Sequence, residues 1–250
     1  MTRTKLAVIA GVVALVTQAA FADNHEKAAD VYIYGTYFYC DVAGEDGADE
    51  AFARRMAPAY KKAMQDGVIS GWGFLKHHTG GKWRRVSYHM GPSVSAIMSA
   101  SDKMGEMMDK DWTDADDAFP AACRAHDDYI WKSAGGTLSG TRGKVGMSVY
   151  MHCDMSMEER ADEIVAKNFA PIYDAHTGKG KLTSWGWSTH VVGGKWRRLL
   201  TMTAEDTDTL FAMRASILGS APDMPEGKEF VKICGSHQDY VWDIAMEGRN

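Results

Sequence analysis

The chain reads GWGFLKHHTGGKWRR at residues 71–85 and SWGWSTHVVGGKWRR at residues 184–198. The second segment begins 113 residues after the first, and the same offset superimposes more distant segments, so that Tyr37 falls on Tyr150. Matches of this kind extend over about a hundred residues of each copy. Two long repeats indicate a duplicated domain, whereas a solenoid needs three or more short ones.

The repeat predicts the domain organisation. We expect a leader peptide, a first repeat, a linker rich in Gly, Ser and Thr, and a second repeat. Their predicted ranges are 1–22, 23–133, 134–143 and 144–250.

The first residues have the pattern of a secretory signal peptide. Arg3 and Lys5 give a basic start, residues 6–16 are apolar, and Ala20-Phe21-Ala22 is a typical cleavage site. An uncleaved membrane anchor is the alternative, but spanning a bilayer takes roughly 18 or more apolar residues. We therefore expect a mature chain that begins near Asp23, lies in the periplasm or outside the cell, and keeps no stable membrane anchor.

Charge and length narrow the classes of partner. The 250 residues carry a formal net charge of −5, and loss of the leader makes the mature chain more acidic. A mildly acidic protein without a basic block is a poor candidate for binding nucleic acid or anionic lipid. We expect a small-molecule ligand as partner. A monomer is the simpler expectation, because the duplicated chain already contains the two units that a single-copy protein brings together by forming a homodimer.

Each copy shows the same order of predicted elements. In the first copy, aromatic and β-branched runs predict strands, and apolar residues at steps of four predict helices. Pro58 and its counterpart Pro171 should interrupt the first helix of each copy. A short helix carries Cys123 and His126, and the last strand starts at Tyr129. The predicted strands lie at 32–40, 69–78, 82–90 and from 129, and the longer helices at 49–65 and 92–108.

The resulting order, β-α-β-β-α-(α)-β, is the ferredoxin-like split βαβ motif. A tandem pair of such units resembles the dimeric α+β barrel superfamily, in which two sheets close around a shared cavity with helices outside. The resemblance covers nearly all of the mature chain and lies in element order and duplication. It implies an α+β pseudo-dimeric barrel. The superfamily includes haem-degrading and cofactor-free monooxygenases, haem peroxidase-like enzymes and binding proteins, so haem is a candidate cofactor and function stays open.

The four cysteines form one pair per copy. An even number of cysteines at matching positions in an exported protein indicates disulfides. Four cysteines allow three pairings, and the repeat favours one bridge within each copy. The predicted bridges are Cys40–Cys123 and Cys153–Cys234.

Zinc is the alternative for these cysteines. Each copy also has two repeated histidines, so each could assemble a Cys₂His₂ set. Structural zinc sites usually have closely spaced ligand pairs, however, and these ligands are scattered, so we predict no metal site. The histidines are His77 and His126 in the first copy and His190 and His237 in the second.

The repeated hairpin offers two different faces. If Gly80-Gly81 is a two-residue turn, His77 pairs with Arg84, and alternation places tryptophans on the opposite face. We expect this tryptophan face to line the space between the two sheets and, with one arginine per copy, to bind a flat molecule with an acidic group. The alternative is that these side chains only fill a core. The predicted ligand-binding residues are Trp72, Trp83, Arg85, Trp185, Trp187, Trp196 and Arg198.

His126 and His237 are the candidate catalytic residues. Each lies in the repeated pattern C-x-x-H-x-D-Y-x-W and could act as a haem ligand or general base. The alternative is a histidine that only hydrogen-bonds the neighbouring backbone or aspartate. No Ser-His-Asp, P-loop, dinucleotide-binding or HExxH motif occurs.

Three functions therefore remain open. The first is a binding protein for a small flat aromatic or anionic ligand held between the two sheets. The second is an enzyme on the same fold, a haem-handling or cofactor-free monooxygenase or other oxidoreductase. The third is an interaction protein with a filled core. An asymmetric site would have to arise where the copies differ, as at Phe74 against Trp187 or His89 against Met202.

Overall fold

The computed structural model describes residues 30–137, 142–220 and 223–249. The predicted leader and residues 138–141 of the predicted linker lie outside the described residues. Among the described residues, no helix is both long and apolar enough to cross a membrane.

The first half contains four strands and four α-helices, in the predicted order. Its elements are β1 (Tyr32–Tyr39), α1 (Glu45–Ala51), α2 (Ala57–Gln65), β2 (Gly71–Gly80), β3 (Arg85–Gly91), α3 (Val94–Asp109), α4 (Ala118–Ala122) and β4 (Ala125–Gly136). The second half repeats this order. Its elements are β5 (Val145–His152), α5 (Glu158–Ile164), α6 (Ala170–Gly178), β6 (Ser184–Val192), β7 (Arg198–Ala204), α7 (Thr207–Ser220), α8 (Pro225–Cys234) and β8 (Ser236–Arg249).

The last strand of the first half is longer than predicted at both ends. It begins at Ala125, so His126 lies on a strand and not on the short helix. It also continues through residues 134–136, which were expected in the linker. The cause is pairing on both edges, because β4 bonds to β1 along one side and to β6 of the other half along the other.

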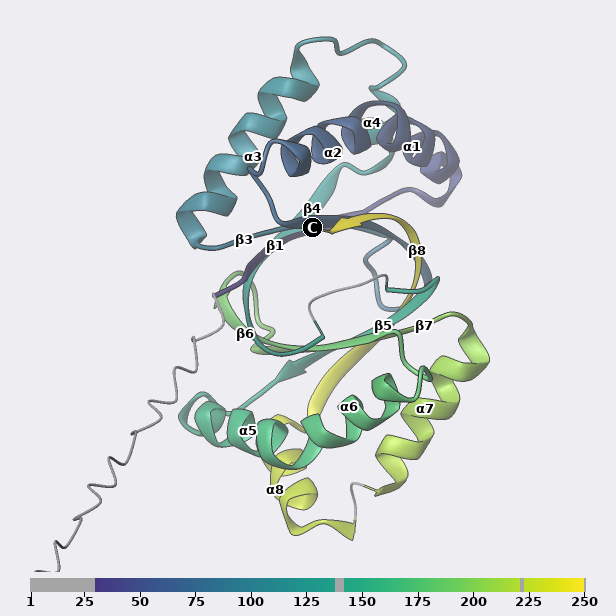
Figure 1. Cartoon of the computed structure of the whole chain (residues 1–250). Coiled ribbons are helices and arrows are strands. Elements are labelled where there is room, and N and C mark those ends of the chain that lie inside the picture. Colours follow the sequence, from purple (N-terminus) through teal and green to yellow (C-terminus); the bar gives the residue numbers. More distant parts are fainter. Residues whose placement is uncertain (1–29, 138–141, 221–222, 250) are drawn as a thin grey trace, which may run out of the picture.

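The eight strands form one closed antiparallel barrel. The strand order is β1-β3-β2-β8-β5-β7-β6-β4, so β2 pairs with β8 and β4 pairs with β6 where the halves meet. Both of these seams contain register shifts, which locally increase the bend of a sheet. Figure 1 shows the barrel between two layers of helices, one from each half. Closure leaves no open edge among the strands of the described residues.

A short π-helical segment precedes each of the repeated prolines. Residues Phe52–Met56 join α1 to α2, and residues Val165–Phe169 join α5 to α6. Pro58 and Pro171 follow in the first turn of the next helix, where a missing N–H is tolerated. The predicted interruption of both helices is therefore confirmed.

Both predicted disulfides are confirmed. Cys40 is bonded to Cys123 and Cys153 to Cys234, each tying the end of a first strand to the segment before the last strand. The zinc alternative fails for the cysteines, because all four sulfur atoms are in disulfides. Each bridge closes a loop of about 80 residues, which restricts the unfolded chain.

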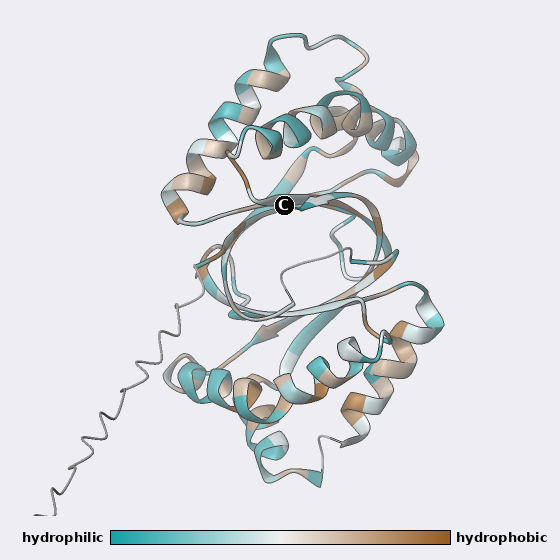
Figure 2. Ribbon diagram, in the orientation of Figure 1, coloured by the Kyte–Doolittle hydropathy of each residue, from teal (hydrophilic) through white to brown (hydrophobic). Residues whose placement is uncertain are grey.

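The buried apolar side chains form three clusters. Each half has one cluster between the barrel wall and its helices, and the third cluster fills much of the barrel interior. Figure 2 shows hydrophilic and hydrophobic residues alternating along the helices of both layers, as expected for helices with one buried face.

Candidate functional site

The predicted register of the first hairpin is confirmed, but the predicted orientation of its faces is wrong. Leu75 pairs with Val86, and the backbone N–H of His77 donates to the carbonyl of Arg84. Leu75 and Val86 face the barrel interior, whereas Trp72 and Phe74 pack against the helices. The tryptophan face thus lies outside the barrel and not between the sheets.

Helix contacts explain this orientation. Trp72 stacks on Tyr60 of α2 with ring centroids 5.4 Å apart, and Trp185 stacks on Tyr173 of α6 at 5.0 Å. Small residues on the opposite face make room for aromatic rings inside the narrow barrel. A Cβ atom at Gly73 would collide with the ring of Tyr88.

Trp83 and Trp196 are the two predicted residues that do lie in the barrel interior. Both lie in the loop of their hairpin. In the first half this loop is longer than the predicted two-residue turn at Gly80-Gly81, because the end of β2 pairs with β8, where Gly80 is opposite Tyr240. Trp83 stacks on Tyr240 of the other half at 5.1 Å, and its indole N–H donates to Asp127 at 2.8 Å. Trp83 therefore connects the two halves, whereas Trp196 contacts the ring of Tyr150 in its own half, with centroids 6.4 Å apart.

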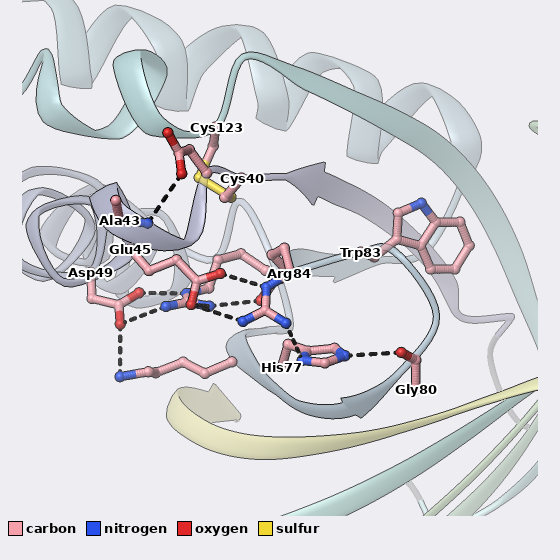
Figure 3. A network of polar contacts seen from close by, with 12 residues as sticks. Cys40, Ala43, Glu45, Asp49, His77, Gly80, Trp83, Arg84 and Cys123 are labelled. Carbon is pink, nitrogen blue, oxygen red and sulfur yellow. Dashed lines mark hydrogen bonds and ion pairs between the residues drawn. A yellow bond between two sulfur atoms is a disulfide. The ribbon is translucent and has the colours of Figure 1, made fainter.

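The predicted arginines are engaged with carboxylates of the first helix of each half. Arg85 is buried and donates to the two oxygens of Asp49 at 2.6 and 3.0 Å. Arg84 donates to Glu45 at 2.5 and 3.1 Å and to Nδ1 of His77 at 2.6 Å (Figure 3). Guanidinium groups held in this way are not placed to bind an acidic ligand in the barrel. The prediction that Arg85 binds the acidic group of a ligand is therefore wrong.

The second half repeats this network. Arg198 donates to Asp162 at 2.7 Å from both Nε and Nη2, and Arg197 donates to Glu158 and contacts His190. The network joins the hairpin of each half to the first helix of that half. Because it is present in both halves, it does not depend on a ligand-binding site in either one. Arg198 is thus corrected in the same way as Arg85.

The network also sets the protonation of its members. Burial lowers the pKa of His77, and the nearby Arg84 lowers it further. Burial alone would raise the pKa of Glu45, but its hydrogen bond to Arg84 and the charge of Arg85 outweigh this and lower the pKa. A neutral imidazole beside charged ion pairs fits a structural role for His77 and not that of an acid.

A pocket of about 220 Å³ opens on the helix side of the second half. It lies between the outer face of strands β5, β6 and β7 and the helices α6, α7 and α8. The wall is mostly apolar and contains four aromatic side chains of Phe, Tyr and Trp. The side chains that define it are Val149, Met151, Val165, Phe169, Tyr173, Trp187, Leu200, Met202, Ile217 and Phe230.

The equivalent space in the first half is occupied by aromatic rings. There Phe52 stacks on Phe74 with centroids 3.7 Å apart, and Phe119 packs beside both. In the second half the repeat places Val165 where the first has Phe52. Without that ring, Val165 and Trp187 both line the pocket, so the pocket coincides with a difference between the copies.

His237 and Arg214 lie at the rim of the pocket. Arg214 forms an ion pair with Asp239, and Nε2 of His237 is 3.6 Å from the same carboxylate. Nδ1 of His237 lies 3.3 Å from the carbonyl oxygen of Gly235, and about half of the side chain is exposed. The structure therefore brings this candidate histidine to the pocket.

His126, the other candidate, is not beside this pocket. Its side chain is about half exposed and Nδ1 lies 3.1 Å from Asp128. Of the residues predicted to bind ligand, Trp187 lines the pocket and Trp185 does not. Comparison of the two copies at Phe52 and Val165 would have located the pocket from sequence.

Haem does not fit this pocket as the structure describes it. The volume of about 220 Å³ is below the roughly 300–1,000 Å³ of pockets for drug-sized ligands. The imidazole nearest to it, that of His237, lies at the rim with both ring nitrogens facing oxygen atoms. Arg214, the cation that could meet a carboxylate of the cofactor, is paired with Asp239. Among the described residues, no group of three or more His, Cys, Asp or Glu side chains is placed to hold a metal ion.

Comparison with known proteins identifies the fold but no family. Neither a protein-family model nor a curated protein matches the sequence. A candidate monooxygenase from Lactobacillus acidophilus is similar in structure at a TM-score of 0.59, with 8% identity over 88% of this chain and 96% of that one. An anthrone oxidase-like protein matches at 0.55, with 9% identity over 89% and 94%.

A third similar structure is a mutant chlorite dismutase from Candidatus Nitrospira defluvii in complex with cyanide. Its TM-score is 0.52, with 9% identity over 86% of this chain and 91% of that one. The fold is the dimeric α+β barrel. At these identities the likeness extends to the fold alone, and the chain spans nearly the whole length of each of the three proteins.

Proposed function

We propose that this protein binds a small, flat, largely apolar molecule in the helix-side pocket of its second half. The observation that carries the proposal is the apolar pocket lined by Trp187, at the position where Val165 replaces the ring of Phe52. Aromatic walls supply stacking area for a flat ligand. The ligand site is thus moved from the space between the sheets, where we first expected it, to the space between sheet and helices.

Exposed apolar residues at the mouth support entry of an apolar ligand. Leu218 on α7 and Val231 on α8 both line the pocket, yet they are 52% and 64% exposed. Apolar side chains exposed together around a hollow are typical of ligand-binding sites. The pocket volume suits a ligand of about two fused rings.

Binding of 2-naphthol, measured by isothermal titration calorimetry, tests the proposal. We expect one molecule per chain and at least tenfold weaker binding in Val165→Phe, which restores the ring found in the first half. Ala166→Phe is the matched control, because residue 166 is exposed and outside the pocket. Equal binding by Val165→Phe and the unchanged protein would contradict the proposal.

A second candidate function is cofactor-free oxidation of the bound molecule. The monooxygenase and anthrone oxidase-like proteins that share the fold support it, as does His237 at the rim of the pocket. A histidine beside a carboxylate can accept a proton from a substrate. In such a reaction a CH₂ group and O₂ give a carbonyl group and water.

Oxygen uptake with 2-tetralone, a two-ring ketone with an activated CH₂ group, tests this candidate. We expect uptake that is lost in Val165→Phe and strongly reduced in His237→Gln, with 2-naphthol binding unchanged in the latter. No uptake by the unchanged protein would reject the enzyme and leave the binding protein. Because the pocket does not fit haem, we also expect no Soret band after addition of hemin, and a stoichiometric band would contradict that expectation.

We further propose that the protein acts as an exported monomer built from two ferredoxin-like units. The basic and apolar leader and the two disulfides support export, since such bridges persist in oxidising compartments. The closed barrel within one chain supports a monomer, because neither half leaves a sheet edge for a second copy.

A further inference from the structure

A second cavity, of about 90 Å³, lies inside the barrel and is separate from the helix-side pocket. One part of its wall is aromatic and comes from the first half, with Tyr37 and Tyr88 among its residues. Another part carries hydroxyl groups and comes from the second half. The cavity therefore combines a mostly apolar wall with a group of hydroxyls on one side.

The hydroxyl groups are not a consequence of the repeat. Strands β5, β6 and β7 contribute them at four positions where the first half has glycine or a larger side chain. Packing symmetry therefore does not account for them. The four are Ser148, Ser184, Ser188 and Thr201, and their counterparts are Gly35, Gly71, Leu75 and Tyr88.

Arg142 extends into this cavity and is only 8% exposed. Its guanidinium group donates to the hydroxyl of Tyr88 and lies 5.1 Å from the centre of that ring. Among the described residues it has no carboxylate within ion-pair distance. Glu247 is nearby, but its Oε1 accepts from the backbone N–H of Arg142 at 3.0 Å and the acid forms no ion pair with the guanidinium.

The backbone around Arg142 is held in place. Its carbonyl accepts from the Thr183 hydroxyl at 2.5 Å, and the N–H of Lys144 donates to Ala204 at 3.0 Å. Gly143 has φ +79°, and a Cβ there would lie 2.5 Å from the carbonyl oxygen of Ala204. A glycine is therefore required at the turn that directs Arg142 into the barrel.

A buried guanidinium without a counter-ion is costly, because the charge has lost its hydration and gained no opposite charge. We propose that the barrel interior binds a small oxyanion, of the carboxylate or phosphate class, between Arg142 and the hydroxyls of Ser148, Ser188 and Thr201. A guanidinium group pairs with such anions through two parallel hydrogen bonds.

The cavity volume limits the size of the anion. One water molecule takes about 30 Å³ of liquid, so the cavity holds a group the size of about three waters. Acetate and inorganic phosphate are of that size, whereas a two-ring molecule is not. The anion site is thus distinct in place and in ligand from the helix-side pocket.

Thermal unfolding with sodium phosphate or sodium acetate, at an ionic strength kept constant with sodium chloride, tests the proposal. We expect the Tm of the unchanged protein to rise with one of these anions and to saturate. The larger response identifies the phosphate or the carboxylate class. In Arg142→Met the saturable rise should disappear, while the exposed-site control Arg124→Met should retain it.

A second variant keeps the test decisive if Arg142→Met does not fold. Ser188→Leu copies Leu75 of the first half and fills the cavity while keeping the arginine. It should lose the saturable rise and keep a native circular dichroism spectrum. No saturable rise in the unchanged protein, or an equal rise in a folded Arg142→Met or Ser188→Leu variant, would overturn the proposal.

Discussion

The two interfaces between helices and sheet are built from the same repeat, yet one is filled and the other is open. In the first half, Phe52 and Phe74 stack at 3.7 Å beneath the helices. In the second half, Val165 and Trp187 at the same positions line a pocket of about 220 Å³. The features that the halves share maintain the barrel, and the features in which they differ form the candidate site.

Loss of a disulfide should have the largest effect, and it should separate stability from binding. Each bridge closes a similar loop, so removal of either, as Cys40→Ser with Cys123→Ser or Cys153→Ser with Cys234→Ser, should lower the free energy of unfolding by roughly 4.5 kcal/mol. Only the second pair should also weaken 2-naphthol binding, because Cys234 lines the pocket. Urea unfolding and calorimetry measure the two effects. If both double variants bound 2-naphthol equally weakly, the loss of binding would reflect lower overall stability and not the place of Cys234 in the pocket.

The arginine networks should respond alike in the two halves. Arg85→Met or Arg198→Met removes a buried guanidinium that hydrogen-bonds a partly buried aspartate, and it should lower the free energy of unfolding by about 1.5–3 kcal/mol, because Asp49 and Asp162 keep Lys76 and Trp187 as partners. Chemical denaturation measures the change, with Arg124→Met on the surface as control. If one of the two substitutions were almost without cost, the network would not be the shared anchor that the repeat indicates.

Removal of the ring of Phe52 should open a pocket in the first half like the one in the second half. Phe52→Val removes the ring that stacks on Phe74 and should cost about 2–4 kcal/mol, less than complete truncation of a buried phenylalanine. We expect the titration with 2-naphthol to reach two molecules per chain. A variant that folds and still binds one molecule would show that Val165 alone does not account for the pocket.

The smallest effect concerns pH and a histidine that only the first half has. Burial lowers the pKa of His89, and Met202 takes its place in the second half. The unfolded chain, with a histidine pKa of about 6.5, then binds more protons than the folded one, so stability is lost as pH falls below that value. His89→Met should reduce this loss between pH 7.5 and 5.5, measured by urea unfolding. His77 and His190 are present in both proteins and do not affect the difference, and an unchanged pH dependence would contradict the argument.

Periodicity and the repeat predicted the local structure well. They gave the element order, the pairing of Leu75 with Val86 and both disulfides. They did not give the orientation of the hairpin faces. Alternation separates two faces but does not say which one the barrel encloses, and Gly73 makes room for the ring of Tyr88 and not for a helix.

The candidate site was only partly predictable for a related reason. Trp187 and Met202, noted as differences between the copies, both line the pocket. The predicted arginines do not, because Asp49 and Asp162 hold their guanidinium groups. Residues repeated in both copies are the easiest to find in a sequence, and here they are the structural ones.

The central claim is that ligand binds on the helix side of the second half. Anomalous diffraction from crystals soaked with 2-bromonaphthalene tests it most directly, since bromine locates the ligand without a model of binding. We predict one bromine peak per chain, beside Trp187 and between the sheet and helices α7 and α8. A peak inside the barrel or beside Phe74, with none beside Trp187, would contradict the account.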